Sequence, residues 1–203
     1  MAHDILALRA RFAHLAEFAW HETWPLSEHQ AEAAVLLPVR SAENGLQVLL
    51  TRRTDHLNHH AGQISFPGGR REEADTSLIQ TALRESQEEI GLDPACVEVL
   101  GVLPEFGTPS GFRITPVVGL LLGDPALRLD DFEVAEVFEV PLEFLLQREN
   151  YQLHRVRWRE GERRVHAVPH GGRFIWGATA GILAMFAAFL LDDVTKAPQG
   201  RAG

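Results

Sequence analysis

The spacing of apolar residues along the chain predicts a series of short strands. Apolar or alternating runs of strand length occupy residues 33–39, 46–51, 97–103, 117–122, 133–141, 151–158 and 164–168. The first two runs flank a turn at residues 41–45, so we expect them to form a hairpin. The Gly- and Pro-rich stretch at residues 104–116 predicts a loop.

Further segments have helical patterns. Residues 5–20 mix apolar and charged positions as an amphipathic helix does. A second helix is expected from about Asp75 to Gly91, because glycine commonly follows the last turn of a helix. The third helix, residues 177–191, belongs to an uncharged stretch, 174–191. That stretch is barely long enough to cross a bilayer and contains glycines and several alanines, so we expect a buried or interface helix.

Composition limits the classes of function that the chain can have. With 203 residues, it is expected to form one domain with short extensions. There are 28 acidic and 19 basic residues, a net charge of −9, which argues against a nucleic-acid-binding protein. The single cysteine, Cys96, cannot form an intrachain disulfide. The N-terminus lacks the basic start and apolar core of a secretory signal, and we expect a cytoplasmic protein.

Three glutamates on the second helix give the clearest chemical signal. Because residues advance by about 100° around a helix, Glu85, Glu88 and Glu89 fall within about a third of its circumference. A solvated surface tolerates such like charges at a cost of a few tenths of a kcal/mol per pair. A divalent cation explains them better, since Mg²⁺ takes carboxylate ligands together with substrate phosphates. Glu85 and Glu89, one turn apart, are spaced to share such an ion.

Neighbouring residues strengthen the metal hypothesis. Gly68-Gly69 permits a backbone turn that a side chain would block, and a backbone carbonyl there could reach the metal. Arg84 is well placed to orient a carboxylate. Taken singly, the glycine pair indicates no more than a turn, and Arg84 no more than a surface salt bridge.

Together these residues resemble the Nudix box. That motif runs Gly, five residues, Glu, seven residues, then Arg-Glu-apolar-x-Glu-Glu-x-Gly-apolar. Here Gly69 begins it, and it ends with Arg84-Glu85-Ser86-Gln87-Glu88-Glu89-Ile90-Gly91-Leu92. Asp75 stands in place of the first Glu, eight residues rather than seven separate it from Arg84, and Ser86 replaces an apolar residue. We therefore expect Asp75 to be the helix N-cap rather than a metal ligand.

The segment before the box resembles the additional motif of coenzyme A pyrophosphatases. That motif reads Leu-Leu-Thr-x-Arg-Ser/Ala, three residues, Arg, three residues, Gly, three residues, Phe-Pro-Gly-Gly. Residues 49–54 and 62–69 match its spacing, and members of this group share the extra residue in the box. Asn58 stands where the motif has Arg, which removes a cation from a region thought to recognise the substrate.

The resemblance extends over roughly residues 30–190 and implies the fold. It implies an α/β (α+β) protein, a Nudix-type α/β/α sandwich with a central mixed sheet and additional N- and C-terminal helices. We expect an N-terminal helical extension over residues 1–30, the Nudix hydrolase domain over residues 31–191 and a flexible tail over residues 192–203.

The same resemblance implies an enzyme that uses Mg²⁺ or Mn²⁺. It would hydrolyse the diphosphate bond of coenzyme A to 4′-phosphopantetheine and adenosine 3′,5′-bisphosphate. Glu85, Glu89 and Gly69 are predicted metal ligands, and Glu88 is either a further ligand or the base that takes the proton of the water. Arg84 completes the predicted catalytic set. Nudix enzymes differ in which carboxylate is the base, so Glu133 and Glu136 are alternatives, although strand-face solvation explains both equally well.

Four arginines in or beside the matching motifs are predicted to bind the substrate, because a guanidinium can bind phosphate through two donors. They are Arg53, which we rank first, Arg52, Arg70 and Arg113. The expected partner is a small molecule, with neither nucleic acid nor membrane. The sequence leaves open the oligomeric state, the preferred metal and the choice between free and acylated coenzyme A.

Two other functions stay open. The chain could be a Nudix hydrolase of NADH, ADP-ribose or a nucleotide sugar, and Asn58 keeps this alternative alive. It could also be a non-catalytic sensor that binds a nucleotide. The intact set of Glu85, Glu88 and Glu89 counts against a sensor, which has no need of all three.

Overall fold

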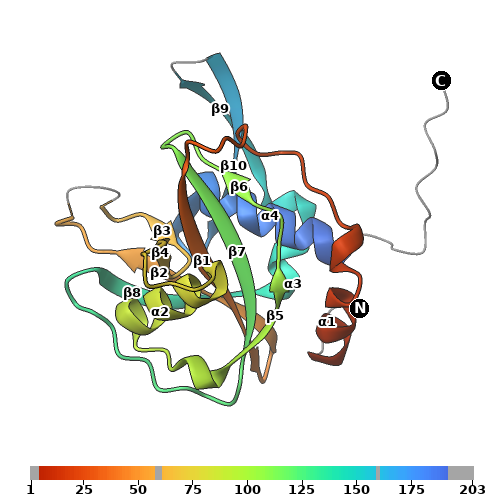
Figure 1. Ribbon diagram of the computed structural model, residues 1–203. Coiled ribbons are helices and arrows are strands. Elements are labelled where there is room, and N and C mark those ends of the chain that lie inside the picture. The colour runs from red at the N-terminus through yellow and green to blue at the C-terminus, as the bar shows by residue number, and fades with distance from the viewer. Residues whose placement is uncertain (1–4, 58–60, 159–160, 192–203) are drawn as a thin grey trace.

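The computed structural model describes residues 5–57, 61–158 and 161–191 (Figure 1). The strands of the larger sheet are β1 (Ala31–Ala42), β2 (Gly45–Arg53), β3 (Ile64–Ser65), β4 (Gly68–Arg70), β5 (Val97–Val102), β6 (Phe106–Gly107), β7 (Phe112–Leu121) and β8 (Val134–Pro141). A smaller sheet contains β9 (Gln152–Trp158), β10 (Gly161–His170) and β11 (Arg173–Trp176). The helices are α1 (Ile5–Phe12), α2 (Leu78–Ile90), α3 (Leu142–Leu145) and α4 (Gly177–Leu191), with short 3₁₀ turns at Leu15–Glu17, Pro94–Cys96 and Arg148–Asn150.

The larger sheet is mixed. Its central order is β3-β2-β1-β7-β5, with β4 paired to β1, β6 to β7 and β8 to β2. β1 and β7 run parallel, whereas the other pairs are antiparallel. The predicted hairpin of residues 33–51 is present as β1 and β2, which meet with Ala42 opposite Gly45. The smaller sheet is antiparallel, in the order β11-β10-β9.

Different helices cover the two faces of the larger sheet. Along β1, Ala34 and Leu36 belong to the apolar cluster that includes α2, whereas Leu37 and Val39 belong to the cluster that includes α4. This alternation follows from the period of two in a strand, whose successive side chains point to opposite faces. The predicted α/β/α sandwich with a central mixed sheet is therefore confirmed.

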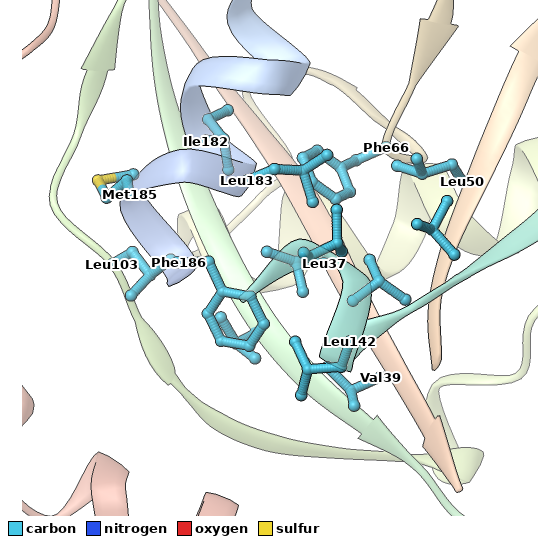
Figure 2. Close-up of a cluster of buried hydrophobic side chains, with 14 of the residues drawn as sticks. Leu37, Val39, Leu50, Phe66, Leu103, Leu142, Ile182, Leu183, Met185 and Phe186 are labelled. Atoms are coloured by element: carbon cyan, nitrogen blue, oxygen red, sulfur yellow. The ribbon is translucent and has the colours of Figure 1, made fainter. Parts of the chain in front are cut away.

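The cluster under α4 is the larger of the two cores. Figure 2 shows Leu183 and Phe186 of α4 close to Leu37 of the sheet, with Phe66 from the segment between β3 and β4 beside them. Leu183 and Phe186 have no exposed surface, so α4 is a buried helix, as predicted. Among the described residues, no helix has the length and apolarity that a membrane crossing requires.

The N-terminal helix is shorter than predicted. α1 ends at Phe12, and its continuation is the 3₁₀ turn Leu15–Glu17. Phe12 and Phe18 both place their rings against Phe189, at centroid distances of 4.9 and 5.3 Å. Residues six apart lie on different sides of a continuous helix, so the chain has to bend for both rings to reach the same partner.

The prediction of a loop over residues 104–116 is wrong in part. β6 lies within it, and β7 begins at Phe112, whose strand pairs in parallel with β1 from Ala31 onward. Pro116 lies inside β7, opposite Val35, although proline commonly marks the end of a strand. β3, β4, α3 and β11 were not predicted. Asn58 and the predicted tail at residues 192–203 lie outside the described residues, and the division into domains stays a prediction.

Candidate active site

α2 is fixed at both ends by its own sequence. Ser77 is the N-cap, since its hydroxyl accepts the Gln80 N–H at 3.2 Å. Gly91 adopts the left-handed conformation that ends the helix, with φ 66°. Ser86, the departure from the apolar position of the motif, is buried and donates its hydroxyl to the Ala82 carbonyl at 2.6 Å. Its polar atom is thus satisfied within the helix, and the face stays compatible with the core.

Glu85 and Glu89 of α2 lie against the backbone of β4. The Gly68 N–H donates to Glu89 Oε2 at 3.1 Å. A Cβ atom at residue 69 would come within 2.5 Å of the carboxylate of Glu85, so a larger side chain there would displace it. The glycine pair therefore allows the helix carboxylates to approach the backbone closely, as a shared ligand site with the Gly69 carbonyl would require.

Burial sets the protonation of these two carboxylates. Glu89 is 6% exposed, and this burial raises its pKa to about 8. The Gly68 N–H and Arg53 oppose the rise, whereas the charges of Glu85 and Glu133 add to it. Burial likewise raises the pKa of Glu85. Acidic groups are thus crowded into a poorly solvated place, an arrangement that a bound cation would relieve.

Asp75 has a different role from the one predicted. It is not the N-cap, which is Ser77. Arg84 donates to both of its oxygens, from Nε at 3.1 Å and from Nη2 at 3.0 Å. The Glu72 N–H and the Thr81 hydroxyl each donate to Oδ2 at 2.9 Å. These donors, Arg84 first, hold the pKa of Asp75 far below its usual range, although its side chain is only 1% exposed.

Arg84, anchored in this way, contacts the glutamates of α2. Its Nη1 donates to Glu88 Oε2 at 2.9 Å and lies 3.0 Å from Glu85 Oε1. Its Nη2 also donates to the Arg70 carbonyl at 3.1 Å. One guanidinium, held from behind by Asp75, thereby orients two of the three glutamates. Glu88, with its side chain 60% exposed, is the most accessible of the three.

The four predicted substrate arginines do not lie together. Arg53 lies in the carboxylate cluster, with Nη1 3.5 Å from Glu89 Oε1 and Nη2 3.4 Å from Glu133 Oε2. Arg52, the next residue on β2, instead pairs with Asp55 and Glu136.

Arg70 and Arg113 lie near Glu32. Arg113 Nη2 donates to Glu32 Oε1 at 2.8 Å. Arg70 holds its guanidinium 5.7 Å from the ring centre of Phe112 and lines an open hollow of about 320 Å³ together with Glu32 and Arg71. Sequence reasoning missed Glu32, because a lone glutamate at the start of a strand carries no motif.

Glu133 and Glu136 have different surroundings. Glu133 faces Arg53, and its charge raises the pKa values of Glu85 and Glu89. Glu136 forms ion pairs with Arg52 and Arg173 instead. The pairing of β2 with β8 shifts register between Arg52 and Arg53, so the two arginines meet different glutamates. This separation depends on strand pairing, which the local sequence did not reveal.

The donor set suits a hard divalent cation. Within the described part of the chain, no three His, Cys, Asp or Glu side chains are already arranged as a metal site. Glu85 and Glu89 nevertheless offer carboxylate oxygens beside the Gly69 backbone, the ligand type that Mg²⁺ and Mn²⁺ prefer. Burial raises both pKa values, and a bound cation would oppose that rise by favouring the ionised carboxylates.

A mainly apolar cavity of about 650 Å³, lined by residues of the cluster that includes α4, was not foreseen from the sequence. Its walls are residues 21–24, the β3 segment through Phe66, residues 106–114, the β9–β10 hairpin and the start of α4. These segments are far apart in sequence, so no local sequence pattern predicts the cavity. Phe66 lies two residues before Gly68, which holds Glu89.

Comparison with known proteins places the chain in a family. It matches the NUDIX domain over residues 29–160. Proteins described as "Uncharacterized Nudix hydrolase NudL", from Salmonella paratyphi B and Salmonella newport, are each 45% identical over 175 residues, covering 86% of this chain and 88% of the relative. A solved structure of the Nudix hydrolase RenU from M. Smegmatis is 24% identical, with a TM-score of 0.49, covering 61% of this chain and 82% of that one. The family match and the 45% identity establish that the chain belongs to the Nudix hydrolase family.

Replacing Asp75 should destabilise the protein in a pH-dependent way. We expect Asp75→Ala to lower the free energy of unfolding at pH 7 by about 3 kcal/mol, because Arg84 loses a buried partner. Since the folded-state pKa of Asp75 lies below its unfolded value of 3.8, its stabilising effect is present above pH 4 and declines as the pH falls further. Urea unfolding of both proteins between pH 7 and pH 3 measures this difference.

The matched control is Asp124→Ala, which removes a largely exposed carboxylate paired with Arg40. It should change the free energy of unfolding by less than about 1 kcal/mol at every pH. An equal loss for the two variants would contradict the anchoring role of Asp75.

Glu89 should have the opposite effect on stability. Its folded-state pKa of about 8 exceeds the ordinary value of 4.5, so folding favours its protonated form. Without metal, the contribution of Glu89 to stability is fully present below pH 4.5 and is lost as the pH rises towards 8. We expect Glu89→Gln, measured in EDTA at pH 7, to be more stable than wild type by about 2 kcal/mol, and the gain to vanish at pH 4. A gain that does not depend on pH would disprove this account.

Proposed function

We propose that the protein hydrolyses the diphosphate bond of coenzyme A, giving 4′-phosphopantetheine and adenosine 3′,5′-bisphosphate. The observation that carries the proposal is that both halves of the coenzyme A pyrophosphatase-like motif adjoin the carboxylate cluster. Thr51 pairs with Ser65 across β2 and β3, and the Arg53 N–H donates to the Gln63 carbonyl at 2.9 Å. The resulting hairpin leads directly to the Gly68 N–H that holds Glu89.

Glu85, Glu89 and the Gly69 carbonyl would hold Mg²⁺ or Mn²⁺, with Glu88 as a further ligand. When bound, the ion would neutralise charge on the diphosphate and lower the pKa of the attacking water. A diphosphate resists attack because its negative oxygens repel an incoming oxygen. The acidic cluster thus needs the cation to receive an anionic substrate, which agrees with the raised pKa values found without one.

The chain's own residues would position the groups and move a proton. Arg84 holds Glu85 and Glu88 in place, and Arg53 offers its guanidinium to the diphosphate beside Glu89. We assign Glu133 as the base that takes the proton from water, because Arg84 engages the carboxylate of Glu88 at 2.9 Å, whereas Arg53 lies farther from the carboxylate of Glu133, at 3.4 Å. Attack of this water on phosphorus breaks one P–O bond of the diphosphate, and the leaving phosphate retains the bridging oxygen.

The substrate assignment is tested by incubating the purified protein with coenzyme A and following the release of adenosine 3′,5′-bisphosphate. We expect turnover with Mg²⁺ or Mn²⁺, none in EDTA, and a loss of kcat of at least about a hundredfold in Glu89→Gln. NADH, ADP-ribose and a nucleotide sugar are run in parallel. A higher kcat/KM for any of these would overturn the coenzyme A assignment, and near-normal turnover by Glu89→Gln would disprove the metal assignment.

The assignment of the base is tested by matched glutamate variants. Glu133→Gln should lower kcat by about a hundredfold or more, because general-base catalysis contributes on that scale. The matched control is Glu136→Gln, because Glu136 lies in β8, just after Glu133, but pairs with Arg52 and Arg173. This variant should retain kcat within about threefold. If the kcat of Glu88→Gln no longer rises with pH, while the kcat of Glu133→Gln still does, Glu88 is the base instead.

A further inference from the structure

An exposed aromatic ring adjoins the carboxylate cluster. Phe132 is 65% exposed and immediately precedes Glu133, whose Oε2 lies 3.4 Å from Arg53 Nη2. Consecutive Cα atoms are about 3.8 Å apart, so the backbone of Phe132 lies next to the cluster. Among the phenyl and indole rings whose exposure the structure describes, two others are largely exposed, and both belong to β11 of the smaller sheet. Phe132 differs from them in standing beside the proposed catalytic residues.

Hydrogen bonds on both sides of Phe132 fix its backbone. Its N–H donates to Asp130 Oδ1 at 2.9 Å, and its carbonyl accepts the Thr54 hydroxyl at 2.7 Å. Thr54, which is buried, also donates its N–H to the Glu133 carbonyl at 3.0 Å. Because Thr54 directly follows Arg53 at the end of β2, the exposed ring is held close to that arginine.

The segment between β7 and β8 curves around α2 and brings Phe132 to this place (Figure 1). Within it, the Arg128 N–H donates to the Ile90 carbonyl at 2.8 Å. The Asp130 N–H donates to the carbonyl of Glu89 at 2.9 Å. The position of the ring is therefore tied to the helix that carries the predicted metal ligands.

A second ring, that of His56, supports Phe132 without covering it. The two ring centroids are 4.9 Å apart, and the ring planes are tilted by 59°. His56 lies between β2 and β3, within the region that resembles the additional motif. Most of Phe132 stays exposed despite this contact, and apolar surface in water is unfavourable. A planar ligand that covers the ring would therefore gain free energy.

The charge around Phe132 favours a neutral ring as its ligand. Asp130 and Asp131 precede it and Glu133 follows it, so a phosphate placed over the ring would meet negative charge. Adenine is uncharged and planar, and nucleic-acid bases stack on aromatic side chains. The pantetheine half of coenzyme A is an aliphatic chain without a π face, so it gains less from such a contact.

We propose that Phe132 is the platform on which the adenine ring of the substrate stacks. The inference rests on the proposed function, because it places the nucleoside half of a substrate whose diphosphate lies at Glu85 and Glu89. One ribose separates the adenine from the diphosphate, so a ring beside Glu133 is within its reach. The 4′-phosphopantetheine half leaves the diphosphate on the opposite side.

The test separates the two halves of the substrate by measuring inhibition by each product. In Phe132→Ala, the KM for coenzyme A and the inhibition constant of adenosine 3′,5′-bisphosphate should each rise about tenfold, because a stacked base is lost. The inhibition constant of 4′-phosphopantetheine should change less than about twofold and kcat less than about threefold, because the ring contributes to binding alone. Phe132→Leu keeps an apolar side chain without a π face and should behave as Phe132→Ala does, whereas Phe132→Trp should restore the wild-type values.

The matched control is Phe174→Ala. Phe174 is 49% exposed and also contacts a histidine, His154, with ring centroids 5.6 Å apart, but it lies in β11 of the smaller sheet. This variant should leave the KM for coenzyme A and both inhibition constants at their wild-type values. Thermal melts of all four variants check that they fold.

The outcomes separate this inference from the proposed function. If Phe132→Ala raises the inhibition constants of both products equally, or changes neither, the adenine assignment is overturned while the proposed function stands. The same follows if Phe132→Leu matches wild type. If wild type does not hydrolyse coenzyme A, the proposed function fails, and calorimetric titration of adenosine 3′,5′-bisphosphate with Mg²⁺ present decides the inference. Equal affinities of wild type and Phe132→Ala overturn it, and binding about tenfold weaker in the variant supports it.

Discussion

The contact between α2 and the backbone of Gly68 and Gly69 is the constraint on which the site depends. Glu89 accepts the Gly68 N–H, and Glu85 occupies the space that a side chain at residue 69 would take. For this contact to form, β4 must pair with β1, and α2 must lie flat on the same face of the sheet. The two glycines thus tie the position of the carboxylates to the centre of the fold, rather than to a surface loop.

Charge within the site is arranged in two opposite ways. Asp75 is surrounded by donors, which stabilise its ionised form and turn it into a fixed support for Arg84. Glu89 is buried with too little positive charge and is held in an unfavourable state for an anion. The first arrangement holds Arg84 in place, and the second is one that a bound cation would relieve. The two carboxylates, both buried, are therefore held in opposite electrostatic surroundings.

The features that sequence could predict are those encoded by local spacing. The helical face of Glu85, Glu88 and Glu89, the end of α2 at Gly91 and the alternation along β1 depend on neighbours in the chain. β7 was only partly predicted because Pro116 resembles a strand breaker, yet parallel pairing with β1 holds the strand on both sides of it. Asp75, Glu133 and the apolar cavity acquire their surroundings from distant segments. The role of Asp75 becomes evident only from its contact with the Arg84 side chain. Glu133 and Glu136 meet different arginines because the pairing of β2 with β8 shifts register between Arg52 and Arg53.

The cavity is formed only in part by the segment that matches the family. The match to the family spans residues 29–160 and includes the glycine pair, α2 and Glu133. Residues 21–24 and the start of α4, which wall the cavity, lie on either side of that span. The matched segment therefore contains the proposed metal ligands, while segments outside it complete the cavity. Substitutions in these flanking segments can therefore reshape the cavity while leaving Gly68, Gly69 and α2 unaltered.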